Sequence, residues 1–218
     1  MNIIAFCARK GGCGKTTSAA SLAICADQQA RLLADAGAPP PLIALIDLDP
    51  QGCLTKFFNQ RDPGGPGPVL VETSLRRLAT TLNELESMGY TEVFLDCPPG
   101  HGAVVDAAMR AATLVIIPCK PSELDLEATK ETVQMAVAVG APYRVLLNDG
   151  TFRTRSMGAA RTALLSLGLP LLSVVHHRVD TMLSSGLTVT ERLPGSTAAA
   201  EIMRAHDAMR GVLRPCPI

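Results

Sequence analysis

A glycine-rich segment near the start of the chain constrains its fold more than any other feature. The segment, residues 10–17, reads Lys-Gly-Gly-Cys-Gly-Lys-Thr-Thr. Residues 2–8 before it form an apolar run of strand length, and residues 16–34 after it are rich in Ala and Leu at helical spacing. A glycine loop between a strand and a helix is the arrangement that wraps a polyphosphate. We therefore expect this chain to bind a nucleotide.

Each residue type in this loop has a physical reason. Phosphate oxygens must be met by several backbone N–H groups at once, and glycines let the backbone curl around them without Cβ clashes. The following helix adds the positive end of its dipole. Lys15 supplies a charge for the β and γ phosphates, the Thr16 hydroxyl is a ligand for Mg²⁺, and Thr17 reaches the α-phosphate. The expected nucleotide-binding residues of the loop are Gly11, Gly12, Cys13, Gly14, Lys15, Thr16 and Thr17.

A second lysine distinguishes this loop from the general pattern G-x-x-x-x-G-K-[ST]. Arg9 stands at the position of the first glycine, and Lys10 follows it directly. The sequence Lys-Gly-Gly-x-Gly-Lys-Thr resembles the deviant Walker A motif of the ParA/MinD family of ATPases. The resemblance implies a P-loop ATPase that uses ATP and Mg²⁺ and forms a homodimer on ATP. It also implies that Lys10 reaches the nucleotide of the partner subunit, so we expect Lys10 and Lys15 to act in catalysis.

Two carboxylates follow the next apolar run, residues 42–47, in the sequence Asp-Leu-Asp-Pro-Gln-Gly. Just past the end of this strand, both carboxylates are expected to lie level with the γ-phosphate of a bound nucleotide and its Mg²⁺. We expect Asp47 to hold a metal-bound water and Asp49 to orient or deprotonate the attacking water. An Asp-Pro turn or a helix cap is the alternative explanation. The segment also resembles the switch I segment of ParA-type ATPases, which favours the catalytic interpretation.

Two further strand ends carry polar side chains suited to a nucleotide site. Asp96 closes the apolar run Val-Phe-Leu, as a Walker B carboxylate does, and is expected to bind Mg²⁺ through water. Asn148 closes the run Val-Leu-Leu where this fold places the base, so we expect it to recognise adenine. A strand-end Asn also serves simply to form a turn.

The alternation of strand and helix patterns predicts an α/β fold with a doubly wound, mostly parallel sheet flanked by helices, in a single P-loop ATPase domain spanning residues 1–218. Most strand candidates are continuous apolar runs, as strands buried on both faces require. The expected strands cover residues 2–8, 42–47, 69–72, 92–96, 114–118, 144–148 and 171–176. The expected helices cover residues 16–34, 75–88, 102–111, 124–139, 156–167, 178–184 and 196–213.

Composition narrows the cellular setting. The formal net charge is zero, which argues against a chain that coats nucleic acid by charge alone. The seven cysteines contain no C-x-x-C pair, so free thiols in a reducing cytoplasm are expected. No apolar run approaches the ~18 residues of a membrane span. Two prolines near the carboxyl terminus argue against an amphipathic membrane helix there, so we expect no membrane partner.

The resemblance extends to a function. The chain is similar to the small ParA class that lacks an N-terminal DNA-binding extension, which implies a nucleoid-associated ATPase that binds DNA without sequence preference and is stimulated by a ParB-like centromere-binding protein. Arg178 matches a DNA-contacting arginine of that family, and Arg204 and Arg210 on the last helix are expected to join it. Solvated helix charges are the alternative for these arginines. Two functions stay open: plasmid or chromosome partition, and positioning of a protein complex with little DNA binding.

Overall fold

The computed structural model describes residues 1–34, 40–62, 65–151, 154–176 and 183–213. Seven strands form one sheet in the order β3-β2-β4-β1-β5-β6-β7, and every neighbouring pair is parallel. This confirms the predicted α/β class. The strands are β1 (Asn2–Phe6), β2 (Leu42–Asp47), β3 (Val69–Leu70), β4 (Tyr90–Asp96), β5 (Leu114–Cys119), β6 (Tyr143–Gly150) and β7 (Leu171–His176).

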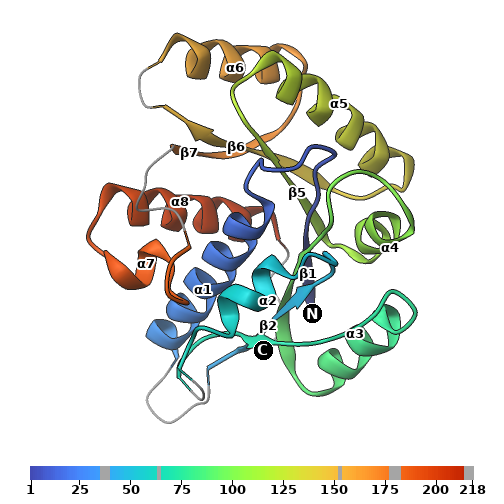
Figure 1. Cartoon of the computed structure of the whole chain (residues 1–218), viewed down its shortest axis with the longest axis vertical. Helices are drawn as coiled ribbons and strands as arrows, with labels where there is room; N and C mark the ends of the chain where they lie inside the picture. Colours follow the sequence, from blue (N-terminus) through green and yellow to red (C-terminus); the bar gives the residue numbers. More distant parts are fainter. Residues whose placement is uncertain (35–39, 63–64, 152–153, 177–182, 214–218) are drawn as a thin grey trace.

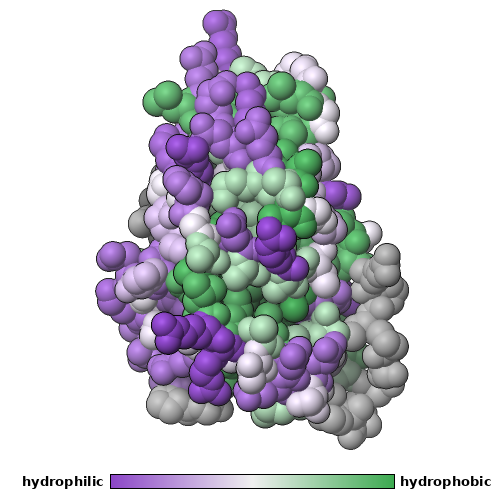
Figure 2. All heavy atoms as spheres, turned by 90° about the vertical axis from the view of Figure 1, so that its right-hand side faces the viewer, coloured by the Kyte–Doolittle hydropathy of each residue, from purple (hydrophilic) through white to green (hydrophobic). Residues whose placement is uncertain are grey.

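Helices cover both faces of this sheet (Figure 1). Among the described residues they are α1 (Lys15–Leu33), α2 (Cys53–Phe58), α3 (Leu78–Ser87), α4 (Ala103–Ala111), α5 (Glu123–Ala138), α6 (Arg155–Ser166), α7 (Val189–Arg192) and α8 (Thr197–Val212). One hydrophobic core joins α3, α4, α5 and α6 to one face of the sheet. The other joins α1, α2, α7 and α8 to the opposite face. Figure 2 views the molecule from the side of α3, α4 and α5, where hydrophobic surface is interspersed with hydrophilic residues.

Successive residues along the strands pack alternately into the two hydrophobic cores. In β1, Ile4 and Phe6 pack toward α1 and α8, whereas Ala5 packs toward α3 to α6. The Phe6 ring lies 6.3 Å from the ring of Phe94 on β4, centroid to centroid, in a stacked pair. Both faces of the central strands β1, β4 and β5 are therefore buried, which explains why their sequences are largely continuous apolar runs rather than alternating ones.

Three helical segments differ from the sequence-based expectation. The short helices α2 and α7 have too few residues to show a helical period, and neither was predicted. The helix expected over residues 178–184 lies mostly outside the described residues. Its described part, 183–184, is not helical, because Ser184 instead forms an isolated antiparallel bridge with Leu187.

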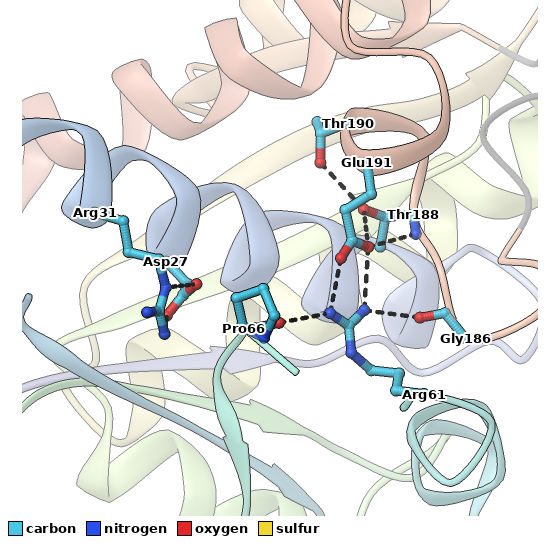
Figure 3. Close-up of polar contacts among 8 residues, drawn as sticks. All are labelled: Asp27, Arg31, Arg61, Pro66, Gly186, Thr188, Thr190 and Glu191. Carbon is cyan, nitrogen blue, oxygen red and sulfur yellow. Dashed lines mark hydrogen bonds and ion pairs between the residues drawn. The ribbon is translucent and has the colours of Figure 1, made fainter. Parts of the chain in front are cut away.

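One arginine ties the segment after α2 to the segment around α7 (Figure 3). The Arg61 guanidinium donates to both carboxylate oxygens of Glu191, at 2.7 and 3.1 Å. It also donates to the backbone carbonyls of Gly186 and Pro66, at 2.7 and 3.0 Å. Glu191 completes a capping box with Thr188 at the start of α7. Charge-assisted bonds of this kind fix both segments against each other.

The contact around Arg61 also requires a glycine at position 186. Gly186 has φ +73°, and a Cβ there would lie 2.8 Å from the backbone of Gln60 and Arg61. We predict that Gly186→Ala lowers the free energy of unfolding by about 2 kcal/mol or more, since left-handed backbone and backbone overlap both oppose it. Urea denaturation measures the change.

Gly158 provides the matched control, because it lies in α6 and a Cβ there meets nothing within 4 Å. Gly158→Ala is expected to raise stability by up to about 1 kcal/mol, as in an open helix interior. Equal stability of Gly186→Ala and the unsubstituted protein would contradict the close approach of the two segments.

Candidate nucleotide-binding site

The glycine loop lies at the carboxyl-terminal edge of the sheet, between β1 and α1. Gly14 is the N-cap of α1 in the left-handed region, with φ +93°, and no side chain caps the helix. The first turn of α1 also carries no acidic residue. Lys15 is buried at the first position of the helix. An uncapped helix start with a buried lysine suits an anion, and the roles of the loop residues in phosphate binding stay predictions.

Thr16 and Asp96 meet beside this loop. The Thr16 hydroxyl donates to Asp96 Oδ2 at 2.6 Å, and Asp96 is 1% exposed. Asp96 Oδ1 is also buried and has no hydrogen-bond partner among the described residues. Burial, opposed by the Thr16 hydrogen bond, raises the pKa of Asp96 to about 7. A buried carboxylate oxygen without a partner, next to a hydroxyl, fits a divalent cation.

In a magnesium site at Thr16 and Asp96, ligands other than protein carboxylates would complete the coordination shell of the ion. Within the described part of the chain, no group of three or more His, Cys, Asp or Glu side chains is arranged to hold a metal ion. Mg²⁺ in nucleotide sites typically takes one or two carboxylates and completes its shell with waters and phosphate oxygens. The donors present, a hydroxyl and a carboxylate, fit that mode of binding.

Asp47 and Asp49 lie next to this pair and also shape their own segment. Asp47 is the register partner of Asp96 across β2 and β4. Its Oδ2 accepts from the N–H and hydroxyl of Thr55, at 2.9 and 3.0 Å, and its Oδ1 accepts from the N–H of Asp49 at 3.1 Å. Asp49 Oδ1 accepts from the N–H of Gln51 at 3.0 Å. Both carboxylates therefore accept hydrogen bonds within their own segment, as the alternative explanation had it, and the catalytic roles of Asp47 and Asp49 stay predictions.

Lys10 contacts α5 rather than its own loop. Its ammonium lies 3.1 Å from Oδ2 of Asp125, and its side chain is 45% exposed. Asp125 is held in the first turn of α5, where its N–H donates to the N-cap Ser122 at 3.2 Å. The sequence did not predict the ion pair of Lys10 with Asp125, because the two partners lie far apart along the chain.

Asn148 lies behind the glycine loop. Its Nδ2 donates to the backbone carbonyl of Cys13 at 2.9 Å, and the residue is 9% exposed. The sequence predicted a contact with adenine and gave no sign of this one.

The three arginines expected to bind DNA differ in their exposure and in their contacts. Arg178 lies outside the described residues. Arg204 is exposed on α8. Arg210 forms an ion pair with Glu92, which is buried near the start of β4, at the edge of the sheet opposite the glycine loop. Arg210 is thus engaged within the protein, which the sequence did not predict because its partner lies 118 residues away.

Comparison with known proteins places the chain in a family. Residues 4–189 match the model of the CobQ/CobB/MinD/ParA nucleotide binding domain. The chain belongs to this family, and within it to the ParA/MinD-type ATPases, which use ATP and Mg²⁺. No helix within the described ranges has the length and apolar character needed to cross a membrane.

Named relatives and solved structures agree with this assignment. The maintenance of carboxysome distribution protein A of Gloeobacter kilaueensis is 34% identical over 72% of this chain and 67% of its own length. The protein of the same name from Halothiobacillus neapolitanus is 27% identical over 75% of this chain and 74% of its own. The septum site-determining protein MinD of Pyrococcus horikoshii, solved with Mg-ADP, superposes with a TM-score of 0.74 at 17% identity and 95% coverage of both chains. At that identity the likeness shows a shared fold.

The raised pKa of Asp96 predicts how the stability of the nucleotide-free protein depends on pH. The carboxyl binds its proton more tightly in the folded chain than in the unfolded chain, where the pKa is near the ordinary 3.8. The nucleotide-free protein should therefore lose this contribution to stability as pH rises from about 4 to about 7, by at most about 1.4 kcal/mol per pH unit. Urea denaturation at a series of pH values measures the slope.

Asp96→Asn keeps the shape of the side chain and removes the titration. We expect the free energy of unfolding of Asp96→Asn to be less steep in pH than that of the unsubstituted protein over this range. Parallel pH profiles for the two proteins would show that Asp96 titrates normally and that its burial is not as described.

Proposed function

We propose that this protein is a positioning ATPase, in which two copies close face to face around Mg-ATP and hydrolysis separates them. The dimer distributes a cargo within the cell while it holds to a surface such as the nucleoid. The carboxysome distribution proteins named above favour a protein assembly as the cargo. Partition of a plasmid or chromosome, with a ParB-like activator, is the second candidate and uses the same cycle.

The second lysine carries this proposal. Lys15 is buried at the start of α1 and serves the triphosphate of its own subunit, whereas Lys10 is half exposed at the rim of the loop. Its partner Asp125 holds it only through an ion pair open to solvent on the lysine side, and such pairs contribute little to stability. Lys10 can therefore leave Asp125 and bind a phosphate of the facing subunit.

The surface around Lys10 suits a face-to-face contact. Leu124, the residue before Asp125 at the start of α5, is 75% exposed. In a face-to-face dimer this side chain would add apolar area to a contact that also contains Lys10. Closure would bury Leu124 and bring Lys10 to the second nucleotide.

Hydrolysis is assigned to the segment after β2. Asp49 orients or deprotonates the attacking water, and Asp47 holds a water of the Mg²⁺ shell. Because Asp47 also anchors Thr55 in the first turn of α2, a change at the γ-phosphate is passed to that helix. The roles of Thr16 and Asp96 are to hold Mg²⁺ against the phosphates.

Binding to DNA, where it occurs, rests on few arginines. Arg178 and the exposed Arg204 supply it, and Arg210 contributes less because Glu92 neutralises much of its charge. A few phosphate contacts per subunit give weak, salt-sensitive and sequence-independent binding. Dimerisation on ATP doubles these contacts, so nucleotide state controls retention on DNA.

Analytical ultracentrifugation tests the role of Lys10. We predict that Lys10→Ala still binds Mg-ATP but no longer dimerises on it, whereas Lys15→Ala loses nucleotide binding itself. Arg9→Ala is the matched control, because Arg9 is the neighbouring exposed cation and pairs with Glu131 on α5. Dimerisation of Lys10→Ala to the same extent as Arg9→Ala would contradict the assignment of Lys10 to the partner's nucleotide.

Retention on nonspecific duplex DNA tests whether the ATP-bound protein is anchored on DNA or on a protein surface. We expect Arg178→Glu and Arg204→Glu each to reduce ATP-dependent retention severalfold and to leave ATPase activity unchanged, because a lost phosphate contact weakens binding without touching the nucleotide. Arg110→Glu, a charge reversal at an exposed position of α4, is the control. Full retention in both test variants would remove Arg178 and Arg204 from the proposal, whereas no ATP-dependent retention of the unsubstituted protein would remove DNA and leave a protein surface as the anchor.

A further inference from the structure

We propose that Asn148 is a positioning residue for the phosphate loop, and that it acts on the loop backbone rather than by selecting adenine. The proposal rests on the assignment of this loop to the triphosphate. It replaces the role in base recognition that the sequence predicted for Asn148.

The contact itself is buried and specific. Asn148 Nδ2 donates to the backbone carbonyl of Cys13, in the middle of the loop, over a sequence separation of 135 residues. A carbonyl only accepts, so the amide nitrogen must face it. A buried carbonyl that lost this donor would carry the free-energy cost of an unsatisfied acceptor.

The phosphate loop packs directly against the side-chain amide of Asn148. A Cβ at residue 14 would lie 2.2 Å from Asn148 Nδ2, so only a glycine fits between the loop and the strand. Gly14 therefore has two separate reasons to be glycine: its left-handed backbone, and the closeness of Asn148. Loop and amide form one packed unit.

A bulge in β6 directly follows Asn148. Asn148 pairs with Val175 and Gly150 pairs with His176, so one extra residue lies between them in β6. Bulges redirect side chains at strand ends. The neighbouring strand end is fixed by Glu201 of α8, which accepts from the backbone N–H of His176 at 2.9 Å. The strand end that carries Asn148 is thus paired with β7, which α8 holds in turn.

The bond has a consequence for anion binding. A phosphate-binding loop needs its N–H groups turned toward the anion and its carbonyls turned away from it. By holding the Cys13 carbonyl, Asn148 keeps one carbonyl of the loop directed at the protein. One N–H of the amide is consumed in this bond, which leaves less of the side chain for the base.

Two variants test the proposal. Asn148→Ala removes the amide, and Asn148→Asp keeps its shape but replaces the donor with an oxygen. In the nucleotide-free proteins, we expect amide hydrogen exchange at Ser18, whose N–H donates to the loop carbonyl of Gly14, to become about tenfold faster, the equivalent of about 1.4 kcal/mol, with no change in β1 or β4. Thr151→Ala, which truncates an exposed side chain just beyond the same strand, should leave the loop unchanged.

Nucleotide selectivity supplies the second readout. We expect Asn148→Ala to weaken Mg-ATP, Mg-GTP and magnesium tripolyphosphate by similar factors, because the loop serves the phosphates of all three. A loss confined to Mg-ATP, or exchange at Ser18 equal to that of Thr151→Ala, would overturn the proposal. Failure of the unsubstituted protein to bind any triphosphate would instead overturn the proposed function, and the exchange measurement would still decide whether Asn148 holds the loop.

Discussion

The contact between the Thr16 hydroxyl and the Asp96 carboxylate is the interaction on which the site depends. It joins the start of α1 to the end of β4 and buries a carboxylate that retains one oxygen without a partner. Burial alone would favour the neutral acid, and the pKa of Asp96 rises accordingly. In the proposed function, a Mg²⁺ ion that arrives with a nucleotide would reverse that preference and favour the ionised carboxylate. Burial in the folded chain thus favours the neutral form of Asp96, whereas binding of a cation favours its ionised form.

The parallel sheet explains how distant segments converge on this contact. All of its described strands run in one direction, so their carboxyl ends lie along a single edge. Asp47 and Asp96 are register partners there, and Asn148 reaches the glycine loop from β6. The end of β2 contacts α2 through Asp47 and Thr55, and the end of β6 pairs with β7, where the His176 N–H donates to Glu201 of α8. These contacts connect the edge of the sheet to α2 and α8.

The sequence predicted those parts of the structure that depend on local pattern. The apolar runs of β2 and β7 were placed to the residue, because each is a short run of mainly apolar residues between segments of different composition. The helix α2 was missed, since its start is defined by the tertiary bonds of Asp47 to Thr55. The pairing of Lys10 with Asp125 and of Arg210 with Glu92 could not be predicted either. Such pairs join residues more than a hundred positions apart, and no local signal records them.

The central claim is that the glycine loop and Asp96 together bind a triphosphate through Mg²⁺. Isothermal titration calorimetry of the nucleotide-free protein with ATP, in magnesium and in EDTA, tests it most directly. The account predicts one ATP per chain, tight binding only with magnesium, and release of a proton when the titration is run below the pKa of Asp96. Binding of equal strength in EDTA, or no binding heat in any buffer, would contradict it.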